Sequence, residues 1–338
     1  MTARQPVHVL YGGAHLFRAD TAAKMGRLAL RSLEDGGLGE LVSGEVLARV
    51  RAKLEHEPVE DLRIDFEDGY GIRPAEEEDG HAKLAGERLA EAYHAGGLPP
   101  SIGIRLRNDW HRAERTLKLF LDAAGVVPKG FVVTLAKVRT ADEMERLAHA
   151  APGISLEAMI ETPEALRHAE AIVKAGPVAA VHFGPYDFTA SLGVPASAQS
   201  LTHPLCDYAR HTLLVALADT GVRISDGPTA LLPIGTKEAV QAAWRVHMSN
   251  VAHALESGIG QGWDLHPAHL PARYAAVYRF YRENLAASQE RLRNYREQSE
   301  QATRVGQAFD DAATVRGLES FFQRGVDCGA LDPSEVPA

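Results

Sequence analysis

Charged side chains occur inside short segments of this sequence that otherwise have the apolar character of buried strands. Asp65 and Glu67 alternate with apolar neighbours, and Arg105 and Arg107 do the same in a later segment. Successive residues of a strand point to opposite faces, so the charged residues of each segment share one face. Unpaired charge is costly to bury, so such groups on the inner face of a sheet are typical of a catalytic or ligand-binding site.

Two further carboxylates are expected to meet at the ends of consecutive strands. Glu161 closes one strand-like segment, and Asp187 follows the next, which breaks at Gly184 and Pro185. Consecutive strands of a parallel barrel are neighbours, so both side chains should lie at the same end of the barrel. Two carboxylates at close range repel each other unless a proton or a cation lies between them.

A divalent cation would relieve this repulsion. Mg²⁺ commonly takes one or two protein carboxylates and leaves its other positions to water and substrate, and Mn²⁺ is the alternative. The competing interpretation is structural, with the carboxylates forming buried ion pairs with Arg105, Arg107 or Lys137. Charges at four strand ends favour the binding site over this interpretation.

The elements that would position these residues follow from a repeated alternation. Short β-branched or apolar segments alternate with helical patterns rich in Ala, Leu and Glu up to about residue 285, which is typical of βα units around a parallel sheet. Eight strands are predicted, the number in a (β/α)₈ TIM barrel. They are Val7–Gly13, Asp61–Asp68, Ser101–Arg107, Gly130–Val138, Ile154–Glu161, Val178–Gly184, Val222–Asp226 and Gly260–Leu265.

Helices are predicted between the strands and after the last one. Residues 1–285 are expected to form the barrel and catalytic domain, and residues 286–338 a more polar, helical C-terminal extension. That extension would pack on the barrel or on a neighbouring subunit, or remain solvated. The predicted helices are Thr21–Asp35, Glu40–Glu55, Arg112–Ala124, Ala141–Ala150, Pro163–Ala175, Lys237–Gly258, Ala286–Gln301 and Thr314–Phe322.

Composition disfavours several classes of protein. The chain has 36 Lys and Arg against 45 Asp and Glu, a net charge of −9 that disfavours nucleic acid or an anionic membrane as partner. Cys206 and Cys328 lack the spacing of a zinc cluster or a disulfide framework. No apolar run approaches the roughly 20 residues of a membrane span, and no signal region is evident, so we expect a cytoplasmic protein.

Six segments, taken in order, carry a family resemblance over about residues 7–280. They are Ile64–Gly69, Ile104–Asn108, Leu135–Val138, Ile160–Pro163, Phe183–Gly193 and Gly262–Pro267. Together they resemble the citrate lyase beta-subunit and HpcH/HpaI aldolase superfamily of phosphoenolpyruvate/pyruvate-binding barrels. Ala136 and Asn108 depart from the family pattern, and Leu10–His15 is not its usual opening. The chain therefore looks like a side branch of the superfamily, and its use of coenzyme A esters stays open.

The resemblance implies specific roles for residues at the barrel mouth. It implies that Glu161 and Asp187 hold Mg²⁺, that Arg105 binds a substrate carboxylate or carbonyl oxygen, and that Glu67 and Asp68 lie near the metal. It also implies that Lys137 lines the site, that a keto acid or hydroxy acid is the substrate, and that the protein is a trimer or hexamer. Pro185 and Asp226 complete the candidate substrate-binding set, although Asp226 could instead cap a turn.

The expected activity is that of a carbon–carbon lyase or aldolase that works through an enolate, with Mg²⁺ and Arg105 stabilising the negative oxygen. The general acid/base would be Asp311 from the C-terminal extension, His15 or a metal-bound water. Three alternatives remain: a thioester hydrolase on the same scaffold, an aldolase that uses Lys137 as a Schiff-base amine, and a catalytically silent metabolite-binding barrel.

Overall fold

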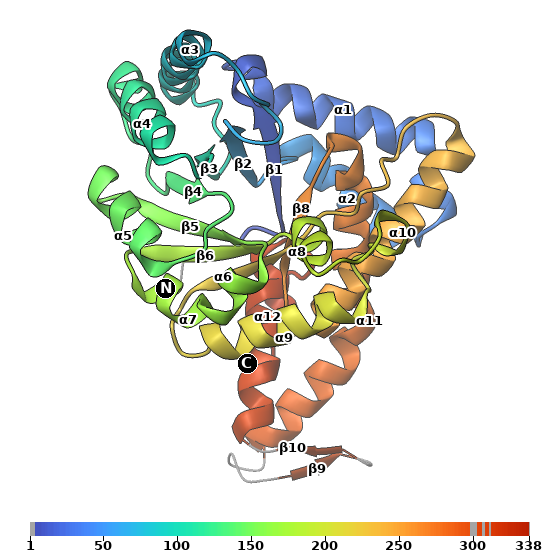
Figure 1. The fold of residues 1–338 in the computed structure, drawn as a ribbon. Helices are drawn as coiled ribbons and strands as arrows, with labels where there is room; N and C mark the ends of the chain where they lie inside the picture. Colours follow the sequence, from blue (N-terminus) through green and yellow to red (C-terminus); the bar gives the residue numbers. More distant parts are fainter. Residues whose placement is uncertain (1–3, 298–302, 306–307, 311, 338) are drawn as a thin grey trace.

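Eight parallel strands, paired in chain order from β1 to β8, close into a barrel that is surrounded by helices (Figure 1). The computed structural model describes residues 4–297, 303–305, 308–310 and 312–337. The predicted (β/α)₈ barrel and all eight predicted strands are confirmed. The strands are β1 (His8–Gly13), β2 (Asp61–Asp65), β3 (Ser101–Leu106), β4 (Val132–Leu135), β5 (Ser155–Ile160), β6 (Val178–Phe183), β7 (Arg223–Asp226) and β8 (Gln261–Asp264).

The outer helices begin and end at the residues that favour such boundaries. A capping box between Thr140 and Glu143 starts α5, and Gly125 in the left-handed region (φ 58°) ends α4. The helices around the barrel are α1 (Thr21–Gly36), α2 (Gly44–His56), α3 (Ala75–His94), α4 (Trp110–Ala124), α5 (Ala141–Ala150), α6 (Pro163–Arg167), α7 (Ala169–Lys174), α8 (Pro185–Ser191), α9 (Pro204–Leu217) and α10 (Lys237–Glu256).

Two details of the sequence prediction were wrong. The segment predicted as one helix, Pro163–Ala175, is divided at His168 into α6 and α7. Asp187 lies in the first turn of the short helix α8 and not in a loop, because Pro185 at the first helical position is already fixed in a helical φ.

The interior of the barrel is polar midway along its strands. Arg63 on β2 donates hydrogen bonds to Glu157 on β5 (Nε–Oε2 2.9 Å and Nη2–Oε1 2.7 Å) and also pairs with Asp61. Thr134 on β4 donates a further hydrogen bond of 2.6 Å to Glu157. All four side chains are buried, so the charges are satisfied by one another.

The C-terminal segment packs on its own chain. Helix α11 (Leu270–Glu297) runs without a break through residues 285 and 286, where the sequence predicted a domain boundary. Strands β9 (Thr303–Val305) and β10 (Ala308–Asp310) pair at the far end of this arm, and α12 (Ala312–Asp327) returns beside α11 (Figure 1). The hydroxyl of Tyr278 donates to the carbonyl of Cys328, which ties the two helices together.

Within the described residues, every helix is too short or too polar to cross a lipid bilayer.

Candidate active site

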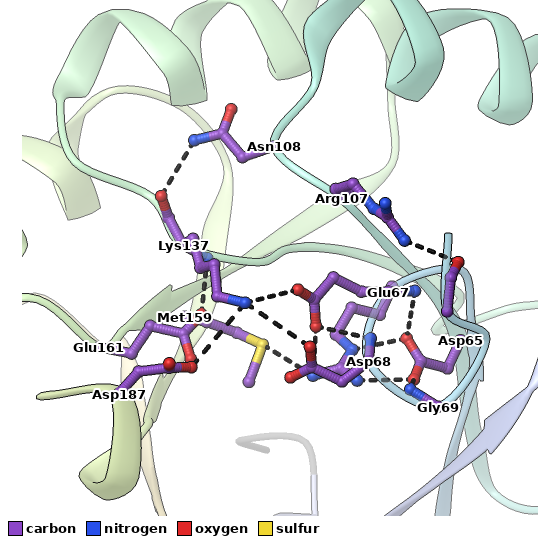
Figure 2. Close-up of polar contacts among 12 residues, drawn as sticks. Asp65, Glu67, Asp68, Gly69, Arg107, Asn108, Lys137, Met159, Glu161 and Asp187 are labelled. Atoms are coloured by element: carbon purple, nitrogen blue, oxygen red, sulfur yellow. Dashed lines mark hydrogen bonds and ion pairs between the residues drawn. The ribbon is translucent and has the colours of Figure 1, made fainter. Parts of the chain in front are cut away.

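Charged side chains from the ends of four strands gather at the C-terminal mouth of the barrel (Figure 2). Glu67 and Asp68 follow β2, Lys137 follows β4, Glu161 follows β5, and Asp187 lies in α8 after β6. Figure 2 shows their side chains turned toward one another, as parity and strand order predicted. Active sites of this architecture lie at the same end of the barrel.

The Lys137 ammonium group lies among three of these carboxylates. Its Nζ is 2.8 Å from Glu67 Oε1, 3.6 Å from Asp68 Oδ1 and 3.9 Å from Asp187 Oδ2. Burial lowers the pKa of Lys137, but the hydrogen bond and negative charge of Glu67 outweigh it and the net pKa is raised. Lys137 is therefore a cation at neutral pH and a hydrogen-bond donor, and it is a poor nucleophile.

Glu161 is the least compensated carboxylate of the group. Its Oε1 accepts one hydrogen bond of 2.7 Å from the backbone N–H of Lys137. Burial, followed by the charge of Asp187, raises the pKa of Glu161 to about 8. A Cβ at position 184 would lie 2.6 Å from Glu161 Oε2, so Gly184 is required for this close approach. The site thus holds two adjacent carboxylates and too little positive charge for both.

The backbone that presents Lys137 is in an unfavourable conformation. Lys137 has φ of 50°, in the left-handed region that non-glycine residues seldom occupy. Asn108 holds this turn by donating from Nδ2 to the Lys137 carbonyl (3.0 Å) and to Glu143 (2.9 Å). Such strain persists only where the surroundings impose it, and it is commonly found at functional sites.

Arg105 forms the floor of the site. Its Nε and Nη2 donate to the two carboxylate oxygens of Asp65 at 2.7 and 2.6 Å. The rings of Tyr11 and Trp263 flank the guanidinium, with centroids 4.5 and 5.1 Å from Cζ, and Met159 Sδ is 3.5 Å from Nη1. Asp65 therefore occupies the Nε and Nη2 edge of Arg105 that could otherwise bind a substrate carboxylate at two points, and Nη1 lies 3.6 Å from Glu67 Oε2 as well as near Met159 Sδ.

The carboxylate pair fits a hard divalent cation. Glu161 and Asp187 offer only oxygen as a donor atom. Glu161 accepts one backbone N–H, and Lys137 Nζ is 3.9 Å from Asp187, so the pair has little positive charge beside it. Among the described residues, no group of three or more His, Cys, Asp or Glu side chains is arranged to hold a metal ion. A closed zinc-type site is therefore not formed by them, whereas an ion that keeps waters and substrate as ligands needs only two.

Two predicted site residues are not part of this group. Asp226 lies on the outer side of β7, where its carboxylate accepts hydrogen bonds from Arg210 of α9 at 2.9 and 3.0 Å. Asp311 lies outside the described residues. Pro185 is buried at the start of α8, and a Cβ on Gly227 would lie 2.2 Å from its Cδ, so Pro185 joins the loops after β6 and β7.

The comparison with known families covers the whole sequence. Residues 1–338 match the family model described as "Domain of unknown function (DUF6986)". The chain belongs to the DUF6986 family. A search of curated proteins finds no significant match to the DUF6986 chain.

Solved structures share the fold of the DUF6986 chain. A citrate lyase from Burkholderia xenovorans LB400 has a TM-score of 0.71 at 21% identity, with 99% of this chain and 96% of that chain covered. CitE from Mycobacterium tuberculosis, in complex with magnesium, acetoacetate and coenzyme A, has a TM-score of 0.65 at 20% identity, with 96% and 99% covered. A citrate lyase beta subunit from M. tuberculosis, complexed with oxaloacetate and magnesium, has a TM-score of 0.52 at 18% identity, with 81% and 97% covered. The predicted resemblance is confirmed at the level of the fold.

Sequence reasoning missed three residues that contact Arg105 in the DUF6986 barrel: Asp65 as its ion-pair partner, and Tyr11 and Trp263 as its aromatic neighbours. Parity placed Asp65 and Arg105 on the inner face of adjacent strands, but the β2–β3 register that sets them opposite each other comes from the structure. The volumes of the cavities would not have revealed the site. A cavity of about 830 Å³ lies elsewhere, between α6, α7 and α9.

Proposed function

We propose that this protein is a Mg²⁺-dependent carbon–carbon lyase or aldolase that acts on a hydroxy acid, or on its coenzyme A ester, through an enolate. The observation that carries the proposal is the undercompensated pair Glu161 and Asp187 beside a fixed Arg105 at the barrel mouth. The shared fold with citrate lyases supports the same reaction class.

Each charged residue of the site would have its own role in the reaction. Mg²⁺ held by Glu161 and Asp187 would supply Lewis acidity. Arg105, fixed by Asp65, would direct the remaining protons of Nη1 and Nη2 at the oxygen that becomes negative as the carbon–carbon bond breaks. Lys137 would stay protonated and donate a hydrogen bond. A fixed guanidinium stabilises charge without reorganising during the reaction, which is the main advantage over water.

A base must take the hydroxyl proton when the bond breaks, and an acid must later protonate the enolate carbon. His15 is the candidate within the described residues. Burial, and then the positive charge of Arg73, lower its pKa, so His15 is neutral at pH 7 and able to accept a proton. Asp311 stays a second candidate from the C-terminal segment.

Ligands of the structural neighbours suggest the range of substrates. The solved structures hold acetoacetate with coenzyme A, and oxaloacetate, and we propose a keto acid or hydroxy acid for this chain. A coenzyme A ester is favoured by one feature. A groove of about 530 Å³ runs along the start of α1, which follows the mouth end of β1, and its lining includes Arg18, Lys24, Arg27 and Arg31, with Asp20 3.5 Å from Arg27. Four cations in one groove suit a phosphate-bearing ligand.

Among the alternatives, a hydrolase cleaving such a thioester would use the same charges and differ in where water is placed. The Schiff-base aldolase is disfavoured because the pKa of Lys137 is raised, and borohydride with pyruvate should leave Lys137 unmodified. We further propose action in the cytoplasm and assembly as a trimer or hexamer, and a molar mass measured in solution would test the assembly.

The decisive test is the Glu161→Gln variant, with Glu164→Gln on the exposed surface of α6 as the matched control. Loss of an outer-shell partner costs about 10- to 100-fold in metal affinity, and loss of a direct ligand should cost at least that much. Calorimetric titration with Mg²⁺, and thermal shifts with Mg²⁺ plus pyruvate, oxaloacetate, glyoxylate or acetyl-coenzyme A, would measure this. Normal Mg²⁺ and ligand binding by Glu161→Gln would instead support a metabolite-binding barrel.

A further inference from the structure

The mouth of the barrel has a charged sector and an uncharged one. After each strand from β2 to β6, a charged residue occurs at or close to the strand end. Strands β7 and β8 end in Asp226 and Asp264, but both carboxylates are buried and paired, with Arg210 and Arg273 respectively. The connections after these strands, residues 227–236 and 265–269, contain no Asp, Glu, Lys or Arg, and the first such residue after β1 is Arg18. Because β7, β8, β1 and β2 are consecutive in the closed barrel, the uncharged connections are adjacent. The charged residues that follow strands β2 to β6 are, in order, Glu67, Arg107, Lys137, Glu161 and Asp187.

Large aliphatic side chains are exposed along the uncharged connections. We name these five residues the apolar sector: Leu16 (66% exposed), Leu231 (50%), Leu232 (36%), Ile234 (55%) and Leu265 (40%). Single exposed leucines are common, but several on adjacent loops at one end of a barrel mark a surface that binds something apolar.

The loop after β7 is held in place by polar contacts to α8 and α10. Tyr186 Oη donates to the carbonyl of Pro228 (2.8 Å) and accepts from the N–H of Ala230 (3.0 Å). Thr229 Oγ1 lies 2.8 Å from His247 Nδ1. The loop is therefore fixed from Pro228 to Ala230, and its next residues present the aliphatic side chains from a rigid base.

Two residues of the apolar sector follow the strands that form the floor of the active site. Tyr11 on β1 and Trp263 on β8 place their rings against Arg105, and the loops after these strands carry Leu16 and Leu265. The apolar sector therefore lies on the side of the mouth where the two rings meet the guanidinium. A ligand with its charged end at Arg105 and the carboxylate pair would have its other end against this surface.

We propose that the substrate is amphipathic, with a carboxylate or keto-acid head among the charged residues and an unbranched aliphatic chain lying on the apolar sector. The inference rests on the proposed function for the position of the head. The charged residues match the head of such a molecule, and the apolar sector matches its chain. The charged residues alone would not distinguish it from pyruvate, which has the head and no chain.

Calorimetric titration of the full chain in Mg²⁺ with straight-chain 2-oxo acids, from pyruvate to 2-oxooctanoate, would test this. Each added methylene that reaches the apolar sector should tighten binding by about two- to fourfold. The heat-capacity change of binding should also become more negative with chain length, since apolar surface is buried. Pyruvate itself should bind without any contribution from the apolar sector.

The double variant Leu232→Ser with Ile234→Ser should abolish this dependence on chain length and leave pyruvate binding unchanged. Both side chains are exposed, so their replacement removes little folding energy. Val246→Ser is the matched control, because Val246 is 45% exposed on the outer helix α10. The control should retain the wild-type gradient of affinity.

Several results would overturn the inference: no binding by any acid, equal affinity along the series, or a gradient that survives in the double variant. An oligomer that dissociates in the double variant while the gradient persists would assign the surface to a second copy of the chain. An aldol assay with pyruvate and aldehydes separates the two proposals. A gradient of binding without carbon–carbon chemistry refutes the proposed function alone, and chemistry with a flat series refutes this inference alone.

Discussion

Two glutamates, Glu157 within β5 and Glu161 just beyond its end, have opposite electrostatic environments. Burial would raise the pKa of Glu157, but the charge and hydrogen bonds of Arg63 hold it well below its ordinary value. Burial also raises the pKa of Glu161, and there the charge of Asp187 adds to the effect, giving about 8. Both side chains are almost fully buried, so neighbouring charges and not depth distinguish the two sites.

The difference separates a structural ion pair from a binding site. In the interior, Arg63 links Glu157 and Asp61 into a network that fills the barrel. At the mouth, the cationic Lys137 is closest to Glu67 and lies 3.9 Å from Asp187, and Glu161 receives only a backbone N–H. A carboxylate that has no cationic partner in the folded chain can bind a metal cation.

The largest expected effect tests the interior half of this comparison. Arg63→Met would leave Asp61 and Glu157 buried without their cation. Removing one partner of a buried pair costs about 3–5 kcal/mol, so the free energy of unfolding should fall by about that amount. Urea denaturation would measure it.

Arg115→Met is the control for this experiment. It removes an exposed pair with Asp79 and should barely change the stability, because solvent screens it. If Arg63→Met were as stable as the wild type, the interior network would not be structural, and Glu157 would become a second candidate for function.

Much of the site could be predicted from sequence because a strand alternates strictly. Parity placed Glu67, Arg105 and Glu161 on inward faces, and strand order placed Glu161 beside Asp187. The same rule, applied to Arg223–Asp226, would have turned Asp226 outward, since Ser225 lies opposite the inward His182. The misassignment of Asp226 was therefore an error of reasoning and not a limit of the sequence.

Other features depend on information that the sequence does not carry locally. The pairing of Asp65 with Arg105 requires the β2–β3 register, which is a tertiary property. Helix α11 continues past residue 285, and its Leu292 and Tyr295 stay buried there because α12 returns beside it, a tertiary contact that the polar composition of the segment does not reveal. The left-handed backbone of Lys137 has no sequence signature and is imposed by Asn108 and the surrounding turn.

The pH dependence of stability tests the mouth half of the comparison in metal-free protein. A carboxyl group whose folded pKa is raised is stabilising below its unfolded pKa and loses that contribution as pH rises. For Glu161 the loss should extend from about pH 4.5 to about pH 8. The slope contributed by one group is at most about 1.4 kcal/mol per pH unit.

Other groups titrate in this range, so the measured quantity is the difference between wild type and Glu161→Gln in urea denaturation with a chelator present. The wild type should lose stability relative to the variant as pH rises toward 8. Saturating Mg²⁺ should reduce the difference, because the cation favours the charged carboxylate. A difference that is independent of pH would mean that the pKa of Glu161 is not raised in the folded protein.

The smallest effect concerns Lys137, whose ammonium group lies near Glu67 and Asp68 after β2 and near Asp187 after β6. The Lys137 side chain is 39% exposed, and its Nζ is 3.9 Å from Asp187 Oδ2. The ammonium group should therefore compete weakly with a metal for that carboxylate. Lys137→Met retains the backbone N–H to Glu161. Because solvent screens half-exposed pairs to about 1 kcal/mol or less, Mg²⁺ should bind up to about fivefold more tightly to the variant.

Calorimetric titration with Mg²⁺ at two salt concentrations would measure this gain, which should shrink as ionic strength rises. Lys174→Met is the control, because Lys174 pairs with Glu170 on the exposed surface of α7 and should leave Mg²⁺ affinity unchanged. Weaker Mg²⁺ binding by Lys137→Met would show instead that the ammonium group orders the carboxylates through Glu67. Lys137 would then be grouped with the structural ion pairs of the interior. Only Glu161 after β5 and Asp187 after β6 would remain as the metal-binding site.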